Sequence, residues 1–341
     1  VQWKDWYLAQ WSIPAENALG LDVDPVNERV VKDMIRDQVW TPVRDYLAAN
    51  PEVDDRVMGI LVGFRVPGNY YVDASTPSLQ GGGGWSVSNR LQNIDPQWFD
   101  TPMAPTNPHL FWADFNQNQV RLTKATLASQ TYLTARLDGP TLDAVKAVTN
   151  RAMTIRTSAQ PLSQADWLYH DYQDVGAPAG DAWERLQAAV NSAALNTPAG
   201  RYPWRAFESE GASMEPIPNC AVYMSYYRLT GWNTVDWSGS PAGSRILAHA
   251  LNSFGATTVR SVTNHSGRFA PNALFTGGFA GAVGATAEPL LISEPQPSTM
   301  IWCLAQGWTM GESFFRANPY CGWMWELVGD PLLRVPQWFE P

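Results

Sequence analysis

Residues 56–65 have the sequence RVMGILVGFR, a short apolar run bounded by turn signals. Such a run is typical of a strand buried in a parallel sheet. The residues before it, Asn27–Asn50, carry apolar side chains at helical spacing and predict a helix that Pro42 kinks or splits. After it, Thr131–Leu137 predicts a second strand and Pro140–Arg151 a second helix. Alternating strands and helices predict an α/β fold with a mostly parallel sheet flanked by helices.

The rest of the chain continues this alternation. Further strands are predicted at Ala18–Val23, Ala165–Tyr172, Cys220–Tyr227, Arg245–Leu251 and Gly281–Thr286, and further helices at 1–12, Asp181–Leu195, Ser298–Gln306 and Thr309–Ala317. A long stretch, Ser86–Thr123, is irregular and rich in Pro, Asn, Gln and aromatic residues. We therefore predict two lobes: an N-terminal α/β lobe that includes this segment (1–130) and a C-terminal α/β lobe (131–341).

The composition excludes several classes of protein. The chain has 341 residues, of which 45% are hydrophobic and 16% charged, and its net charge is −9. This chain is too hydrophobic to be disordered, and its acidity argues against nucleic acid or an anionic membrane as the main partner. No apolar run approaches the roughly 18 residues of a membrane span. Scarce Lys and 17 Trp residues favour a secreted, cell-surface or periplasmic protein in an assembly.

Cysteine and glycine patterns give little support for a cofactor. Cys220, Cys303 and Cys321 allow at most one disulfide and form no zinc-binding motif. The tetraglycine Gly81–Gly84 lacks the strand and helix context of a phosphate-binding loop, and a surface loop explains it better. We predict no cofactor.

Two groups of residues are candidates for chemistry. His249 lies in the run ILAHALNS at the expected carboxyl end of a strand, where α/β sheets place reactive groups, and Ser253 follows it. The alternative for His249 is a hydrogen-bonded histidine in the core. Asp171 and Asp174 could bind a metal ion, but their spacing fits no calcium loop and such residues more often form turns and caps. Glu288 follows a small-residue strand, and it either faces a cleft or caps a turn.

Five stretches along nearly the whole chain carry a resemblance to a known family. They are YLAQWSIPAENALGLD (7–22), GILVGFRVP (59–67), ARLDGPTLDAV (135–145), GGFAGAVGATAEPLL (277–291) and WTMGESFFRANPYCGWMWELVGDPLLRV (308–335). RLDGPT and VGDPLLR are the most specific pieces. Together they resemble a family of predicted exported bacterial proteins, found for instance in planctomycetes, that is distantly similar to gingipain-type cysteine peptidases. The resemblance implies a caspase-like α/β fold, export from the cell, and a further strand ahead of residue 1.

The resemblance also bears on catalysis. Gingipain-type peptidases need a His after one strand and a Cys after the next, and the matching positions here fall near Tyr227 and Ser253. A tyrosine, with a pKa near 10, is a poor base for a serine at neutral pH. The resemblance therefore implies a non-peptidase with a binding or surface-assembly role. The alternative is a hydrolase that uses Ser253 with His249, or a metal held by carboxylates such as Asp171 and Glu288.

A binding site is predicted in the cleft that corresponds to the peptidase site. If the fold is right, the carboxyl ends of strands 222–227, 246–251 and 281–286 lie side by side, where open α/β sheets bind ligands. The predicted binding residues beyond these ends are Tyr227, Arg228, Trp232, Asn252 and Glu288. Such a set fits a polar, uncharged ligand such as a sugar or a peptide end. A cleft filled by loops or by a neighbouring subunit is the alternative, and self-association or another surface protein is the expected partner.

Overall fold

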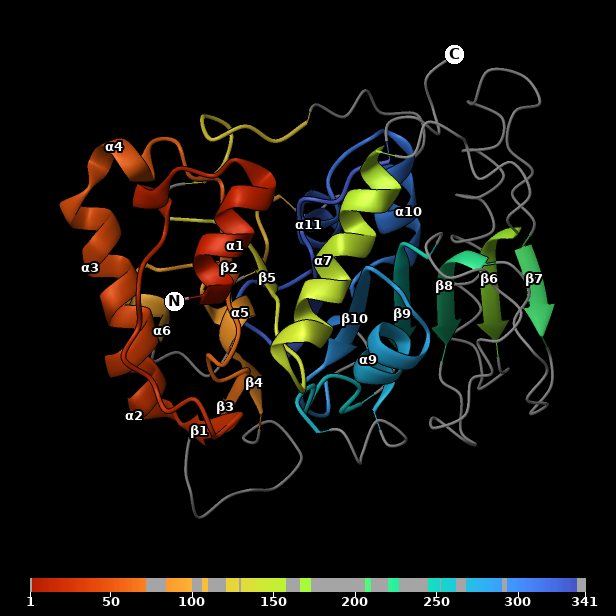
Figure 1. Ribbon diagram of the computed structural model, residues 1–341, viewed down its shortest axis with the longest axis horizontal. Helices are drawn as coiled ribbons and strands as arrows, with labels where there is room; N and C mark the ends of the chain where they lie inside the picture. Colours follow the sequence, from red (N-terminus) through yellow and green to blue (C-terminus); the bar gives the residue numbers. More distant parts are fainter. Residues whose placement is uncertain are drawn as a thin grey trace.

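A mixed sheet of eight strands forms the frame of the molecule (Figure 1). The computed structural model describes residues 2–71, 84–99, 106–109, 121–128, 130–157, 166–172, 206–209, 220–226, 245–251, 253–261, 268–289 and 293–335. The strand order is β2 (Gly59–Val62), β5 (Leu133–Arg136), β11 (Trp325–Gly329), β10 (Gly281–Ala285), β9 (Leu247–Leu251), β8 (Cys220–Tyr226), β6 (Asp166–Tyr172) and β7 (Ala206–Ser209). Of the seven neighbouring pairs six are parallel, and only β10 and β11 are antiparallel. The predicted α/β fold with a mostly parallel sheet flanked by helices is confirmed.

Helices cover both faces of this sheet (Figure 1). The longer ones are α1 (Gln2–Trp11), α3 (Thr41–Ala49), α7 (Leu142–Thr157), α10 (Pro297–Ala305) and α11 (Met310–Ala317). Alternate residues of β10 face opposite ways, because Ala282 packs in a cluster with Val145 of α7, whereas Val283 packs in a cluster with Met310 of α11. Burial on both faces explains why this strand lacks the apolar/polar alternation of a half-exposed strand.

Close approach explains the small residues of β10, whose sequence is GAVGA. A Cβ on Gly281 would lie 2.4 Å from Cε of Met310 in α11. On Gly284, a Cβ would lie 3.1 Å from Cβ of Ala256, in the turn that follows β9. Helix α11 and this turn can therefore pack directly against the strand.

The predicted helix Asn27–Asn50 is interrupted. Arg29–Val31 is a strand, β1, followed by α2 (Lys32–Ile35), a wider helical turn over Arg36–Trp40, and α3. The helix prediction was wrong for Arg29–Val31, because β1 pairs in parallel with β3 (Asn69–Tyr71) and backbone pairing overrides the helical spacing. Pro42 lies in the first turn of α3, where its missing N–H breaks no helical hydrogen bond.

Short elements complete the N-terminal part. They are α4 (Pro51–Asp54), β4 (Trp85–Ser86), α5 (Val87–Arg90) and α6 (Pro96–Phe99), while α9 (Phe269–Pro271) precedes β10. β1, β3 and β4 form a separate three-stranded sheet. The predicted strand Ala18–Val23 was wrong, since these residues pair with no strand and run as a loop between α1 and β1.

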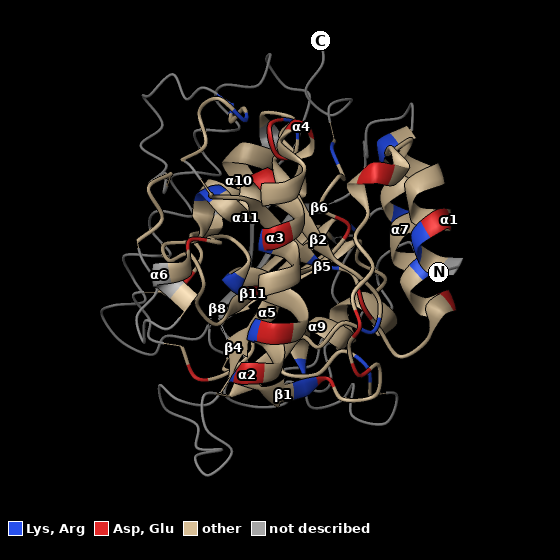
Figure 2. Ribbon diagram, turned by 90° about the vertical axis from the view of Figure 1, so that its left-hand side faces the viewer, with Lys and Arg blue, Asp and Glu red and all other residues tan. Residues whose placement is uncertain are grey.

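The outer helices carry mixed charge. Acidic and basic residues lie side by side on α1, α2 and α3, as Figure 2 shows. Two of these pairs are exposed ion pairs, Lys4–Asp5 at 3.4 Å and Arg44–Asp45 at 2.6 Å. This side of the molecule is therefore not a uniformly charged surface.

The tryptophan side chains that the structure describes are buried or half-buried. Trp40, Trp85, Trp308 and Trp325 are buried, and the other Trp side chains that the structure describes are half-buried. In the described part of the chain, the Trp-rich composition supplies core packing rather than an exposed aromatic surface.

Residue 130, the predicted boundary between the two lobes, lies between two strands of the same sheet. β2, before that residue, pairs in parallel with β5, after it, from Gly59 opposite Leu133 to Val62 opposite Arg136. The division into lobes 1–130 and 131–341 stays a prediction. None of the helices in the described ranges is long and apolar enough to cross a membrane.

Candidate functional site

The carboxyl ends of β9 and β10 bring two predicted residues together. Ser253 follows β9, Glu288 follows β10, and the Ser253 hydroxyl donates a hydrogen bond of 2.6 Å to Oε1 of Glu288. Parallel pairing of the two strands, with Val283 opposite His249, sets this position. The pair lies toward solvent, because Glu288 is exposed and Ser253 is half-buried.

The other predicted binding and metal residues are not placed. Tyr227, Arg228, Trp232, Asn252 and Asp174 lie outside the described residues, and of Asp171 only the backbone, in β6, is described. The predicted cleft around them stays a prediction. Among the described side chains, no group of three or more His, Cys, Asp or Glu is arranged to hold a metal ion.

His249 has a different partner from Ser253. It is fully buried, and its Nε2 lies 3.3 Å from Oε1 of Glu294. Its ring packs against Trp325 at 5.6 Å between centroids, and Trp325 donates from its Nε1 to the Ser293 hydroxyl. Burial raises the pKa of Glu294, and the hydrogen bond from His249 opposes that rise. His249 is thus a core histidine that is hydrogen-bonded through Nε2, while its buried Nδ1 has no hydrogen-bond partner in the described part of the chain.

The cysteine side chains that the structure describes are buried and have raised pKa values. Cys303 and Cys321 are both buried and free. Burial raises the pKa of both thiols, that of Cys321 to about 12. Since the thiolate is the nucleophile, neither thiol is activated at neutral pH. The side chain of Cys220 lies outside the described part.

A buried network of charged residues, which was not predicted from the sequence, lies at the end of β5. Arg136 is fully buried and pairs with Glu28 at 2.6 Å, Asp138 at 2.7 Å and Glu326 at 3.3 Å. Arg260 pairs with Asp138 at 2.6 Å. We call these five residues the Arg136 cluster. It joins β5, β11, the approach to β1 and the turn after β9, so it fixes parts of the chain that are far apart in sequence.

Two carboxyl groups of the Arg136 cluster have pKa values shifted in opposite directions. Burial raises the pKa of Glu326 to about 7, although Arg136 opposes this rise. Burial also acts to raise the pKa of Asp138, but Arg136 and Arg260 outweigh it, and that pKa lies below its usual value. The sequence signal for this cluster is RLDGPT, one of the two most specific stretches, which contains Arg136 and Asp138.

The second specific stretch, VGDPLLR, also anchors a buried carboxylate. Asp330 accepts hydrogen bonds from the Tyr7 hydroxyl at 3.1 Å and from Trp11 Nε1 at 3.0 Å, both on α1. Burial raises the pKa of Asp330 to about 6. Asp330 therefore ties α1 to the end of β11.

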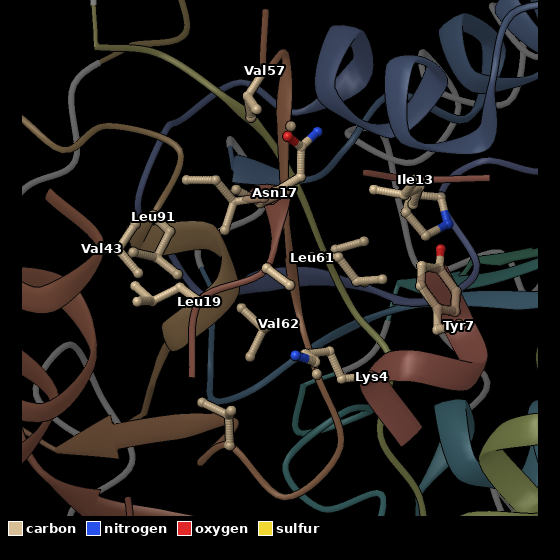
Figure 3. Close-up of a pocket in the computed structure, with 18 of the residues that line it drawn as sticks. Lys4, Tyr7, Ile13, Asn17, Leu19, Val43, Val57, Leu61, Val62 and Leu91 are labelled. Carbon is tan, nitrogen blue, oxygen red and sulfur yellow. The ribbon is translucent and has the colours of Figure 1, made fainter. Parts of the chain in front are cut away.

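A large apolar cavity lies along the open edge of β2. Its volume is about 1150 Å³, and we call it the β2 cavity. Figure 3 shows side chains from four places around it: Tyr7 of α1, Leu19 of the loop after it, Val43 of α3 and Leu61 of β2. The sequence does not reveal this site, because the apolar run of β2 is typical of a strand buried within the sheet, whereas β2 is an edge strand.

Ionisable groups are few in the lining of the β2 cavity. The charged lining residues are Lys4, Arg56, Arg65, Arg121 and Glu312. Glu312 is neutralised by a two-pronged pair with Arg121, at 2.7 and 2.8 Å. The remaining charged groups are cations, in a protein whose net charge is −9. The arrangement can hold an apolar ligand with acidic ends.

Comparisons with known proteins give distant structural neighbours. No protein-family model matches the chain, and no curated protein matches its sequence. A solved complex of the pro- and mature domains of RgpB from Porphyromonas gingivalis matches with a TM-score of 0.41 and 11% identity, over 60% of this chain and 56% of that one. The Arg-specific cysteine proteinase gingipain R (RgpB) matches with a TM-score of 0.39 and 10% identity, over 70% of this chain and 62% of that one. The chain thus spans less than two thirds of each solved chain.

Proposed function

We propose that this protein is an exported, non-peptidase protein that binds a partner in a surface assembly, and that the β2 cavity is its binding site. The observation that carries the proposal is the cavity itself. Protein interiors leave few voids larger than a water molecule, whereas ligand sites are apolar clefts of roughly 300–1,000 Å³ with few polar groups. An apolar space of about 1150 Å³ with a basic rim favours binding over packing.

The polar groups near β9 and β10 support the non-peptidase part of the proposal. Ser253 donates to Glu288, and His249 is buried against Glu294. A serine nucleophile needs a base within hydrogen-bonding distance that can take its proton near neutral pH. An exposed carboxylate is a weak base for that step. Export is supported by the low charge content and by the family resemblance.

A hydrolase remains the rival function, because one contact favours it. The bond of 2.6 Å between Ser253 and Glu288 is short, as hydrogen bonds to carboxylates are, and it lies toward solvent, where a substrate can reach it. In this rival, Glu288 replaces His249 as the partner of the serine.

One experiment separates binding from hydrolysis. The full chain is incubated with a broad panel of covalent activity probes, together with Ser253→Ala and, as a matched control at the buried histidine, His249→Ala. The proposal expects no labelling that depends on Ser253. Labelling lost in Ser253→Ala and kept in His249→Ala would establish the rival.

A second experiment tests the cavity. A fluorescent dye with apolar rings and one sulfonate group, anilinonaphthalene sulfonate, is titrated into the wild-type chain and into Val43→Trp, which places a bulky indole in the cavity. Val26→Trp is the control, because Val26 is 78% exposed and lies outside the lining. We expect dye binding that Val43→Trp removes and Val26→Trp preserves. Equal binding by all three proteins would refute the proposed site.

A further inference from the structure

The open edge of β2 presents backbone groups to the β2 cavity. The Leu133 and Leu137 N–H groups donate to the Met58 and Val62 carbonyls. These two hydrogen bonds show which backbone groups of β2 point toward β5. In a parallel pair, alternate residues of a strand face the neighbour. The N–H and C=O groups of Gly59 and Leu61 therefore face away from β5, and no backbone partner for them lies among the described residues.

The two walls of the cavity match the two faces of the sheet. Leu61 packs with the α1 side, in the two clusters against which Trp11 of α1 also packs. Its neighbours Ile60 and Val62 pack with the α3 side, in the cluster that contains Val43. The cavity is thus a slot in the plane of the sheet with apolar walls above and below. An added strand would direct alternate side chains to one wall and then to the other.

The basic rim restricts the chemistry of the occupant. Lys4 and Arg56 are 42% and 58% exposed at the side chain, and their carboxylate partners lie at 3.4 and 3.8 Å. Exposed pairs of this length contribute little, so an incoming carboxylate can compete for either cation. An apolar segment with acidic residues beside it is complementary to this rim.

We propose that the occupant of the β2 cavity is an extended apolar peptide segment of a partner protein, flanked by acidic residues, which adds to β2 as a further strand of the sheet. This inference rests on the proposed binding function and names the class of partner. The decisive feature is the hydrogen-bonding capacity of Gly59 and Leu61. A fatty acid fits the apolar walls and the basic rim, but its chain offers no groups to pair with a strand edge, whereas a peptide backbone does.

The test uses the full wild-type chain and backbone-modified peptides. The probe is a fluorescein-labelled peptide of about seven residues, Glu-Val-Thr-Val-Ile-Val-Glu, a length typical of a strand. Two isomers carry N-methyl groups on alternate residues, one on the odd and one on the even positions. Because only one edge of the peptide can pair with β2, we expect one isomer to lose about tenfold or more in affinity, while the other stays within about threefold of the parent peptide. Fluorescence anisotropy gives the affinities.

The outcomes separate this inference from the function on which it rests. Unequal isomers, together with loss of the parent peptide in Val43→Trp and retention in Val26→Trp, support strand addition. Equal affinities of the two N-methylated peptides would overturn strand addition. Strand addition would also be overturned if no peptide binds and palmitate displaces the dye. In both cases dye binding that Val43→Trp removes would keep the cavity as a binding site. Dimerisation that Val43→Trp abolishes, with no peptide bound, would make a second copy the occupant and also overturn the inference.

Discussion

The Arg136 cluster and the β2 edge lie on neighbouring strands but differ in how their polar groups are used. Each carboxylate oxygen of Glu28, Asp138 and Glu326 accepts at least one hydrogen bond from the protein itself. On the open side of Gly59 and Leu61, no described group accepts or donates. In the first region every carboxylate oxygen is thus paired within the protein, although the buried Nε of Arg136 has no hydrogen-bond partner among the described residues. In the second region Gly59 is exposed and Leu61 is half-buried, so their backbone groups are accessible to the partner strand proposed above.

The largest expected effect is the loss of unfolding free energy when the Arg136 cluster loses its central cation. Arg136→Met removes the central cation and leaves three carboxylates close together in the interior. Removing one partner of a buried ion network typically costs about 3–5 kcal/mol of unfolding free energy. We expect a loss of this size in urea unfolding. Arg36→Met is the control, because Arg36 forms exposed pairs, and its loss should stay below about 1 kcal/mol. Similar losses in both variants would contradict a special role for the cluster.

The next effect tests how tightly the cluster is enclosed. A Cβ on Gly68 would lie 1.8 Å from Nη1 of Arg136, so Gly68→Ala must displace the guanidinium. Overpacking of this kind costs roughly 1–3 kcal/mol. Gly20→Ala is a matched control, since a Cβ there meets nothing within 4 Å. Thermal unfolding of the two variants should separate them, and an unchanged Gly68→Ala would mean that the guanidinium is free to move.

A pH effect distinguishes the carboxylates within the cluster. Burial raises the pKa of Glu326 from 4.5 to about 7, so the folded state holds its proton more tightly than the unfolded chain. The unfolding free energy should therefore fall as the pH rises from about 4.5 to about 7, by roughly 1–3 kcal/mol for this group. Asp330, whose pKa is raised to about 6, acts in the same direction. Urea unfolding at about pH 5 and about pH 7 should show a smaller fall in Glu326→Gln than in the wild-type chain. An equal fall in both would assign the effect to other groups.

The sequence predicted the frame of the fold better than its site, for physical reasons. Local spacing identified β5, β10, α7 and α11, because the apolar pattern that predicts each of them lies within a single segment of the sequence. It missed β1, whose pairing with β3 is a contact between distant residues. It also missed the Arg136 cluster, in which Arg136 and Glu326 are 190 positions apart. Ser253 and Glu288 were found because strand ends could be predicted, whereas the edge position of β2 depends on the order of all eight strands.

The smallest expected effect is the loss of unfolding free energy when Leu61, in the wall of the β2 cavity, is truncated. Leu61 is half-buried beside the β2 cavity, so truncation to Ala adds to a space that already exists and removes few contacts. Leu327 in β11 is fully buried, and its truncation opens a new cavity. We expect Leu61→Ala to lower the unfolding free energy by about 1 kcal/mol and Leu327→Ala by about 2–5 kcal/mol. Urea unfolding of the isolated chain measures both. A loss in Leu61→Ala as large as that in Leu327→Ala would mean that the cavity is collapsed in solution and that the β2 edge is closed by the protein itself.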